Sequence, residues 1–401
     1  MAKPARIFPA IAAGADVKRI PIAPRANKAA RIKELDFGFA EVDGQTYWDE
    51  SVYYAFTLEQ IERDIEAPSA ELAALCLELV EKVVNSEQLL EVLKIPQAAW
   101  DVIKLSWQQK DPSLYGRFDF AYDGKGPAKL LEYNADTPTS LYEASVFQWF
   151  WLEDARAQNL IPDTADQYNS LHEKLIARLK DIASDFPLHI ASMPDSIEDD
   201  GFCAYLADCA TQAGIQTHRL TMPDIVLNGE DFRDSEGRKI TRLFKLYPWE
   251  WMFADDFGTS PAMETTLFLE PPWKAILSNK GLLPLLWQQN PGHPNLLPAF
   301  FENDPGKDRL EGRFVRKPLY SREGANVLIV DKDQVLANEG GLYGAEGYIR
   351  QAIGPAPDFG GVFPVLGSWI VGDAACGLGI REDSSMITHN NARFVPHAII
   401  G

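Results

Sequence analysis

The sequence has few of the residues that usually form metal centres or covalent nucleophiles. It contains four cysteines and six histidines in 401 residues, with no CxxC, HxxxH or HExxH spacing, so a zinc site or a disulfide framework is not indicated. It also lacks a GxSxG elbow and a recognisable Cys/His nucleophile pattern, so covalent catalysis is not signalled. The scattered cysteines fit a reduced, cytoplasmic setting, and Cys203 and Cys209 are expected to be small buried residues of a helix.

Long hydrophobic runs are also missing, and acidic residues outnumber basic ones. No apolar run approaches the ~18 residues of a transmembrane helix, and the N-terminus has no apolar signal core. The formal net charge of −20 argues against nucleic-acid binding and suits a cationic substrate. We therefore expect small-molecule partners, with no nucleic acid and no membrane, and the oligomeric state is not determined by the sequence.

Positive charge is concentrated at the N-terminus. Residues 1–34 carry eight lysines and arginines, several prolines and few acids. We predict a basic, extended arm over residues 1–34 that lies on an acidic globular body formed by residues 35–401. A partly disordered tail is the alternative interpretation.

The segment from Arg117 to Ser140 has the pattern of a β-hairpin with aligned polar side chains. A turn at Asp123–Gly126 separates the strand that begins at Arg117 from the strand that ends at Asn134. Side chains two residues apart in a strand share a face, so four polar residues can converge if the two faces coincide. These residues are Arg117, Asp119, Glu132 and Asn134.

This group has the chemistry of a magnesium and phosphate site. Mg²⁺ prefers oxygen ligands, which Asp119, Glu132 and Asn134 would supply together with nucleotide phosphates. Arg117 would supply a planar donor pair for a phosphoryl group or a developing oxyanion. A surface hairpin with a cross-strand salt bridge is the alternative.

The remaining periodicity predicts a mixture of helices and strands. Leu58–Glu66 reads as a short helix that Pro68 interrupts, and Trp149–Leu152 lie in a later helix and are expected to be core residues. The order strand, acidic loop, helix, strand after residue 187 indicates an α/β unit. Other predicted helices are 69–84, 140–159, 168–186, 196–213 and 281–288, and predicted strands are 188–191, 217–220, 243–247, 314–319, 327–330, 348–351, 367–371 and 375–380.

Two lysines are candidates for phosphate binding. Lys317 lies on a predicted strand directly before a loop that contains Gly324, where loop N–H groups could cover phosphates. Lys280 precedes a predicted helix, where the helix dipole does not favour a cation unless an anion is also present. Neither the Walker A nor the Rossmann pattern applies here.

Five separated runs, in order, resemble the glutathionylspermidine synthase family, and most closely its shorter branch of acid–amine ligases. The runs are LYGRFDF…LLEYNADTPTSLYE (114–143), KLYPWEW (245–251), EPPWKAILSNKGLLPLLW (270–287), RKPLYSREGANV (316–327) and GIRED (379–383). The resemblance covers residues 35–401 and leaves out the arm. It implies an ATP-grasp fold of the α+β or α/β class, with the nucleotide between two antiparallel sheets, an α/β subdomain similar to a pre-ATP-grasp unit at about 187–270 and a lid at about 274–352.

The resemblance also implies an activity and its residues. The activity is ATP-dependent C–N ligation of a carboxylate and an amine through an acyl phosphate, with ATP and two Mg²⁺ ions as cofactors and ADP and phosphate as products. It assigns catalytic contacts to Arg117 and Arg381, and metal binding to Asp119, Glu132 and Asn134. Nucleotide binding falls on Lys280, Lys317, Ser321, Arg322, Glu323, Gly324, Ala325 and Gln351, and substrate binding on Thr137, Thr139, Glu198, Asp199 and Asp200.

Two departures from the family pattern limit this assignment. The bifunctional members carry an N-terminal cysteine amidase that has no counterpart here, so we predict that the amide product is not hydrolysed. Where the polyamine-binding branch has a lysine and an aspartate, this chain reads Asn390 and Arg393, which argues against spermidine as the amine. A catalytically inactive nucleotide- or peptide-binding relative and a carboxylate kinase remain alternatives.

Overall fold

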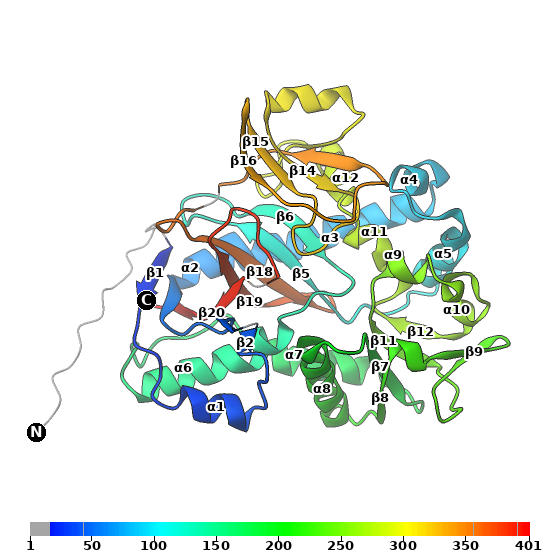
Figure 1. Ribbon diagram of the computed structural model, residues 1–401, viewed down its shortest axis with the longest axis horizontal. Coiled ribbons are helices and arrows are strands. Elements are labelled where there is room, and N and C mark those ends of the chain that lie inside the picture. The colour runs from blue at the N-terminus through cyan, green and yellow to red at the C-terminus, as the bar shows by residue number, and fades with distance from the viewer. Residues whose placement is uncertain (1–16, 43, 356, 391) are drawn as a thin grey trace, which may run out of the picture.

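The computed structural model describes residues 17–42, 44–355, 357–390 and 392–401, and it shows a mixed α/β chain with several sheets (Figure 1). Two of these sheets are antiparallel and five-stranded, and one four-stranded sheet is parallel. No helix within the described ranges is long and apolar enough to cross a membrane. Mixed α/β architecture was expected from the sequence and is confirmed.

The central antiparallel sheet contains the predicted hairpin. Its order is β20 (Arg393–Val395), β19 (Ala374–Asp383), β18 (Phe363–Val371), β5 (Tyr115–Ala121) and β6 (Lys129–Asn134). Strands β5 and β6 pair antiparallel, with Arg117 opposite Asn134 and Asp119 opposite Glu132. This pairing confirms the prediction of a hairpin at this position. The turn between the two strands sets their register.

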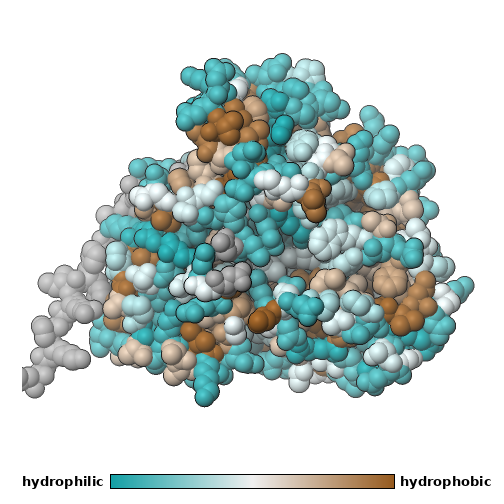
Figure 2. All heavy atoms as spheres, in the orientation of Figure 1, coloured by the Kyte–Doolittle hydropathy of each residue, from teal (hydrophilic) through white to brown (hydrophobic). Residues whose placement is uncertain are grey.

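The second antiparallel sheet forms the top of the molecule in Figure 1, and we call residues 274–352 the lid. Its order is β13 (Ala299–Phe301), β17 (Tyr348–Gln351), β14 (Arg313–Pro318), β15 (Leu328–Asp331) and β16 (Gln334–Asn338). The helices α11 (Ala275–Ser278) and α12 (Leu282–Gln289) and the 3₁₀ turn Pro305–Leu310 complete it. Val335 and Leu336 are exposed on the edge strand β16, where Figure 2 shows an apolar patch.

The parallel sheet belongs to the predicted α/β unit. Its order is β12 (Leu267–Leu269), β11 (Arg242–Leu246), β7 (Leu188–Ser192) and β8 (Thr217–Thr221), and helix α8 (Ile197–Gln212) connects β7 to β8. Ser196 caps α8 by accepting a hydrogen bond from the Asp199 N–H at 3.2 Å. Smaller elements of this unit are β9 (Val226–Asn228), β10 (Asp231–Arg233), α9 (Trp249–Met252) and α10 (Ala262–Thr265).

The described part of the N-terminal arm packs on the body, as predicted, but it is not simply extended. It contains the strand β1 (Lys18–Pro21) and the helix α1 (Lys28–Glu34). Strand β1 pairs with β4 (Val52–Phe56), which also pairs with the C-terminal strand β21 (His397–Ile399). Arg19 and Arg31 reach acids of the body, and residues 1–16 of the predicted arm lie outside the described ranges. Two short strands, β2 (Glu41–Val42) and β3 (Gln45–Thr46), follow.

The helices behind the central sheet differ from the prediction in two places. Pro68 does not interrupt the first helix. The helix α2 (Leu58–Ile61), a π-turn at Glu62–Glu66 and the helix α3 (Ala67–Val84) follow one another without a break. Pro68 lies in the first turn of α3, where a residue without a backbone N–H is tolerated. The helix predicted at 168–186 is shorter, α7 (Leu171–Asp181). The other helices are α4 (Glu87–Val92), α5 (Trp100–Gln108) and α6 (Gln148–Ala157), the last preceded by a π-turn at Glu143–Phe147.

The aromatic run in α6 is only partly in the core. Trp151 and Leu152 are buried, as predicted, but Trp149 is 40% exposed and Arg31 covers the ring of Phe150. A helix presents successive residues to different sides, so four adjacent apolar residues cannot all face one core. The four cysteines are each free and buried, and Cys203 and Cys209 lie in α8 as expected.

Candidate active site

One pocket of about 310 Å³ lies between the two antiparallel sheets and the carboxyl ends of the parallel strands. The hairpin β5–β6 supplies the acids, the lid supplies the lysines, and the loops after β7 and β11 close the third side. The predicted site residues that line it are Arg117, Asp119, Glu132, Asn134, Thr137, Thr139, Asp199, Lys280, Lys317, Ser321, Arg322, Glu323, Gly324 and Arg381.

The hairpin places its four polar residues on one face, as the alternation predicts. The Arg117 Nε donates to the Asp119 Oδ1 at 2.6 Å, and the Asn134 Nδ2 lies 3.1 Å from the Asp119 Oδ2 and 3.3 Å from the Glu132 Oε1. From β19, the Arg381 Nη2 also donates to the Asp119 Oδ2 at 2.9 Å. Arg117 and Arg381 therefore meet at one carboxylate.

This meeting of two cations is visible in their pKa values. Burial and the nearby Arg117 both lower the pKa of Arg381, and Asp119 only partly offsets them. Burial acts in the same direction on Arg117, but Asp119, Glu132 and Tyr47 together outweigh it and raise the pKa of Arg117. The site is therefore electropositive around one acid, which suits an incoming phosphoryl group or carboxylate.

The two predicted lysines approach the hairpin from the lid. The Lys280 Nζ lies 3.0 Å from the Glu132 Oε2, so Glu132 is the anion that a lysine before helix α12 requires. The Lys317 Nζ donates to the Leu131 carbonyl at 2.8 Å and to the Gln351 Oε1 at 2.9 Å. Gln351 thus orients Lys317 from behind and does not line the pocket.

Charge coupling between these groups is strong. Although burial favours the neutral acid, Lys280 and Lys317 lower the pKa of Glu132. Burial lowers the pKa of Lys317 to about 8, because Lys280 opposes much of the help from Glu132. Two cations and one anion therefore leave a positive surplus where phosphates could bind.

The predicted phosphate loop, residues 321–325, covers the pocket from the lid. The Ser321 hydroxyl is buried without a hydrogen-bond partner, while its carbonyl accepts from the Lys280 Nζ at 2.8 Å. Gly324 has a positive φ of 74°, and a Cβ there would approach the Ile387 Cγ2 to 2.5 Å. Ala325 stays outside the pocket.

Arg322 does not point at the lysines. Its Nη1 donates to the Thr137 Oγ1 at 2.7 Å, and its Nη2 donates to the Glu250 Oε1 at 2.9 Å. The lid loop is therefore tied both to the central sheet and to the α/β unit. Sequence reasoning missed Glu250, although it lies in the KLYPWEW run that was singled out.

The predicted substrate acids are divided by the start of α8. Asp199 lines the pocket, and burial raises the pKa of Glu198 to about 7, with repulsion by Asp199 adding to it and a Thr139 hydrogen bond opposing it. Asp200 points elsewhere: it pairs with Arg219 and lines a neighbouring pocket. Successive residues in the first helical turn face different directions, so three consecutive acids could not all reach one site.

A buried pair beside the pocket was also missed. The Tyr47 hydroxyl donates to the Glu143 Oε1 at 2.5 Å and contacts the Ser140 hydroxyl at 3.3 Å. Burial, with repulsion from Glu198, raises the pKa of Glu143 to about 8. Glu143 ends the longest family-like run, which was the available signal.

His389 joins the lid to the body near the same pocket. Its Nδ1 lies 2.8 Å from the Asp383 Oδ2 on β19, and its Nε2 lies 2.9 Å from the Glu339 Oε1 of the lid. Burial would lower the pKa of His389, but the two carboxylates raise it. The two contacts are therefore strongest when the imidazole is protonated.

The donor set fits Mg²⁺ only if a ligand contributes further oxygens. Two carboxylates and one amide face one point, and no group of three or more His, Cys, Asp or Glu residues suited to a metal occurs within the described ranges. Mg²⁺ accepts such a sparse set because it is commonly completed by water and nucleotide phosphates. Asp119 and Glu132 would hold it together with the amide oxygen of Asn134, whose amide nitrogen faces the two carboxylates in this structure.

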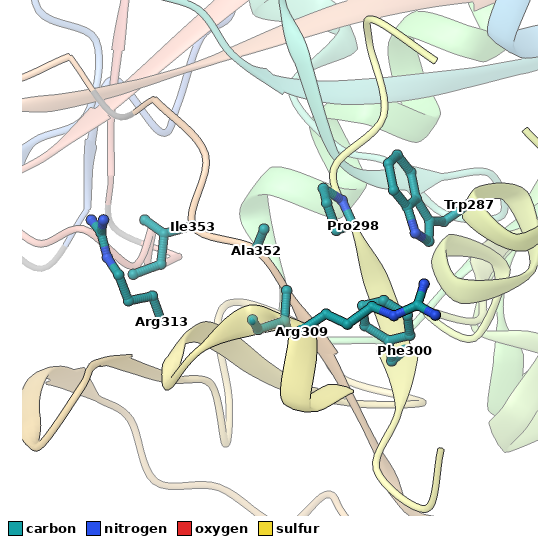
Figure 3. Close-up of a pocket in the computed structure, with 8 residues that line it drawn as sticks. Trp287, Pro298, Phe300, Arg309, Arg313, Ala352 and Ile353 are labelled. Carbon is teal, nitrogen blue, oxygen red and sulfur yellow. The ribbon is translucent and has the colours of Figure 1, made fainter. Parts of the chain in front are cut away.

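A second pocket, of about 360 Å³, lies on the lid and contains none of the predicted site residues (Figure 3). Trp287, Pro298 and Phe300 form its apolar wall, and Arg309 and Arg313 lie at its sides. Without carboxylates or a lysine pair it lacks the chemistry described above. The pocket between the sheets is therefore the candidate active site.

Comparison with known proteins shows the family of this chain. The family model described as Glutathionylspermidine synthase preATP-grasp matches residues 19–400. The chain belongs to the glutathionylspermidine synthase family. The match begins at Arg19 rather than at residue 35, so the expectation that the whole arm lies outside the family likeness is wrong for residues 19–34.

Proteins similar to this chain are named as ligases and synthetases. A Haemophilus influenzae protein named “Putative acid--amine ligase” is 41% identical over 370 residues, which are 89% of this chain and 92% of that protein. The trypanothione synthetase of Crithidia fasciculata is 29% identical, and the bifunctional glutathionylspermidine synthetase/amidase of Escherichia coli is 26% identical. The matches cover 79% and 91% of this chain but only 52% and 62% of those two proteins.

The solved structures add a likeness of fold. A glutathione synthetase-like effector from Globodera pallida aligns with a TM-score of 0.54 at 11% identity, over 93% of this chain and 96% of that one. Of the two family departures, Asn390 lines the candidate site, whereas Arg393 contacts Asp49 and Glu382 and does not line the pocket.

Proposed function

We propose that this chain is an ATP-dependent acid–amine ligase that joins a small carboxylic acid to an amine through an acyl phosphate, releasing ADP and phosphate. The observation that carries the proposal is the pocket in which Asp119, Glu132 and Asn134 face Lys280 and Lys317. Two antiparallel sheets around such a pocket support an ATP-grasp arrangement with the nucleotide between them. The relatives named as acid–amine ligase and glutathionylspermidine synthetase support the reaction class.

The nucleotide would lie along the lid. Apolar side chains of β14, β15 and the C-terminal loop line one end of the pocket and would hold the base; they are Val315, Val327, Ile329, Met386 and Ile387. Lys280, Lys317 and the loop from Ser321 to Gly324 would hold the phosphates. Mg²⁺ bound at Asp119, Glu132 and Asn134 would neutralise phosphate charge.

The positions of the two arginines support the reaction that we propose. A carboxylate oxygen of the acid attacks the γ-phosphorus, and the bond from that phosphorus to the bridging oxygen breaks, which releases ADP. Arg117 and Arg381 would offset the charge that spreads over the transferred group. The amine nitrogen then attacks the acyl carbon, phosphate leaves, and the nitrogen loses a proton.

The acid and amine would bind on the side of the α/β unit. Thr137, Thr139 and Asp199 line the pocket on this side, and Asp199 would attract a cationic amine. Glu198 lies next to Asp199 outside the pocket lining, and its partial negative charge near neutral pH would add to that attraction. The lid loop would exclude water, because an exposed acyl phosphate hydrolyses.

The test is a screen for ADP release that crosses small peptides and amino acids with amines. We expect release that requires both an acid and an amine, and that Asp119→Ala and Glu132→Ala abolish while far-ultraviolet circular dichroism is unchanged. Asp123→Ala removes an acid from the turn of the same hairpin, where it accepts a hydrogen bond from the Lys125 N–H at 2.9 Å, and should keep full activity.

Three results would change the proposal. Release with an acid alone, with a trapped acyl phosphate, would indicate a carboxylate kinase. MgATP binding without turnover on any pair would indicate a non-catalytic relative. Full turnover in both Asp119→Ala and Glu132→Ala would remove the metal assignment.

A further inference from the structure

The GIRED run contains two acids that the proposed reaction does not use, and one of them is fully buried. Glu382 follows Arg381 on β19 and has no solvent exposure. The Arg19 Nε donates to the Glu382 Oε2 at 2.8 Å, and the Arg19 Nη2 donates to the Glu382 Oε1 at 2.8 Å. The Tyr54 hydroxyl at 2.9 Å and the Arg393 Nη2 at 2.6 Å complete its partners.

These partners come from three different strands. Arg19 on β1 lies directly opposite Tyr54 on β4, so the β1–β4 ladder presents both side chains together. Arg393 lies opposite Glu382 on β20, within the central sheet. Figure 1 shows β1 beside the ends of the C-terminal strands, although it lies more than 350 residues earlier in the chain.

Glu382 and Arg381 are adjacent in a strand and therefore point to opposite faces. The planar peptide between them fixes the distance between their Cα atoms. A Glu382 side chain that is held in place therefore restricts the position of the Arg381 Cα, from which the guanidinium extends. Arg381 needs such restriction, because it shares Asp119 with Arg117 and like charges repel. The ladders to β18 and β20 hold β19 in the sheet, so losing the anchor would free only the local backbone at Arg381 to shift and relieve the repulsion.

We propose that Arg19 and Glu382 are positioning residues, through which the N-terminal strand β1 clamps β19 from behind and holds Arg381 at Asp119. The predicted effect on kcat rests on the proposed function, but the structural role of the Arg19–Glu382 pair does not. This role would connect the described part of the basic arm to the site, because the arm would hold the backbone next to Arg381 in place. A purely stabilising salt bridge is the competing explanation.

The arm offers a matched control. Arg31 is also held in a two-pronged pair, with its Nε 2.9 Å and its Nη2 3.0 Å from Asp154 on α6. That pair joins the same arm to the same body, but the side-chain hydrogen bonds of Arg31 go to Asp154 and Glu34 and to no residue of β19. Arg31→Gln therefore removes a comparable link without touching the clamp.

The first measurement is kinetic, on the full chain with an acid–amine pair found in the screen. Arg19→Gln should lower kcat for ADP release at least about tenfold, with the KM for MgATP within about twofold of the parent, because Arg381 acts on the transferred group. Arg19→Lys keeps the charge but loses the planar fork, and should recover only part of kcat. Tyr54→Phe removes a single hydrogen bond and serves if Arg19→Gln does not fold. Arg31→Gln should leave kcat unchanged.

The second measurement is amide hydrogen exchange along residues 379–383, which needs no turnover. Arg19→Gln should accelerate exchange there at least about tenfold, and Arg31→Gln should not. Faster exchange in Arg19→Gln, together with no ADP release from the parent protein, would contradict the proposed function but support the clamp. Unchanged exchange in Arg19→Gln, or equal loss of kcat in Arg19→Gln and Arg31→Gln, would overturn the clamp.

Discussion

The lowered pKa of Lys317 leads to a quantitative prediction about nucleotide binding. Its ammonium must be charged to hold a phosphate, and its pKa in the free protein is about 8. Binding above that pH therefore requires proton uptake, so affinity falls as the pH rises. From pH 7 to pH 9 the protonated fraction falls from about 90% to about 9%, which is about a tenfold loss of affinity or about 1.4 kcal/mol.

The assay is calorimetric titration of ATP without metal, between pH 7 and pH 9.5, where the terminal phosphate has already lost its second proton. Omitting metal separates Lys317 from the proposed metal ligands. Glu132→Gln removes the carboxylate that supports the charged lysine, and should shift the fall in affinity to lower pH. Lys317→Arg stays charged throughout and should make the fall in affinity shallower, leaving only the part due to ionisation of Glu198 and Glu143. A flat profile in the parent protein, or an equal slope in Lys317→Arg, would refute the reasoning.

Two further perturbations test the lid. Gly324→Ala should weaken ATP binding several-fold, because the added Cβ would approach the Ile387 Cγ2 to 2.5 Å at a φ of 74°. Gly229→Ala is the control, since Gly229 has a similar φ of 66° but open space around it. Equal effects of the two variants on ATP affinity would contradict a lid contact. The raised pKa of His389 means that its bridge between lid and body stabilises the protein fully below about pH 6.5 and is lost as the pH rises through that raised value. In urea denaturation, His389→Gln should therefore cost about 1 kcal/mol at pH 6 and less as the pH rises, and a cost independent of pH would count against the bridge.

The hairpin was predictable because its information is local. Period-two alternation and the Gly-containing turn determine which side chains share a face, so Asp119, Glu132 and Asn134 could be grouped without a structure. The acids at residues 198–200 show the limit of such reasoning. Their sequence proximity suggested one cluster, but helical geometry sends Asp200 to Arg219 and leaves only Asp199 in the pocket.

Contacts between distant segments were not predictable from local pattern. Nothing near Glu132 indicates that Lys280 approaches it at 3.0 Å, and nothing near Arg381 indicates that Arg19 supports it from behind. The family-like runs suggested that these regions belong together, but they did not specify the contacts. The pKa values of Glu198 and Lys317 likewise depend on burial and on neighbours that only folding supplies.

By itself, the sequence determined the charge balance, the alternating strands, the capped helix after Ser196 and the residue types available for phosphate and metal chemistry. Only the tertiary structure decided that two antiparallel sheets face each other across one pocket, with the lid lysines at the hairpin acids and the N-terminal strand behind β19. The physical reason is that dihedral preference and side-chain periodicity act over a few residues. Charge pairing, burial and the resulting pKa shifts depend on distances that chain folding alone brings into range.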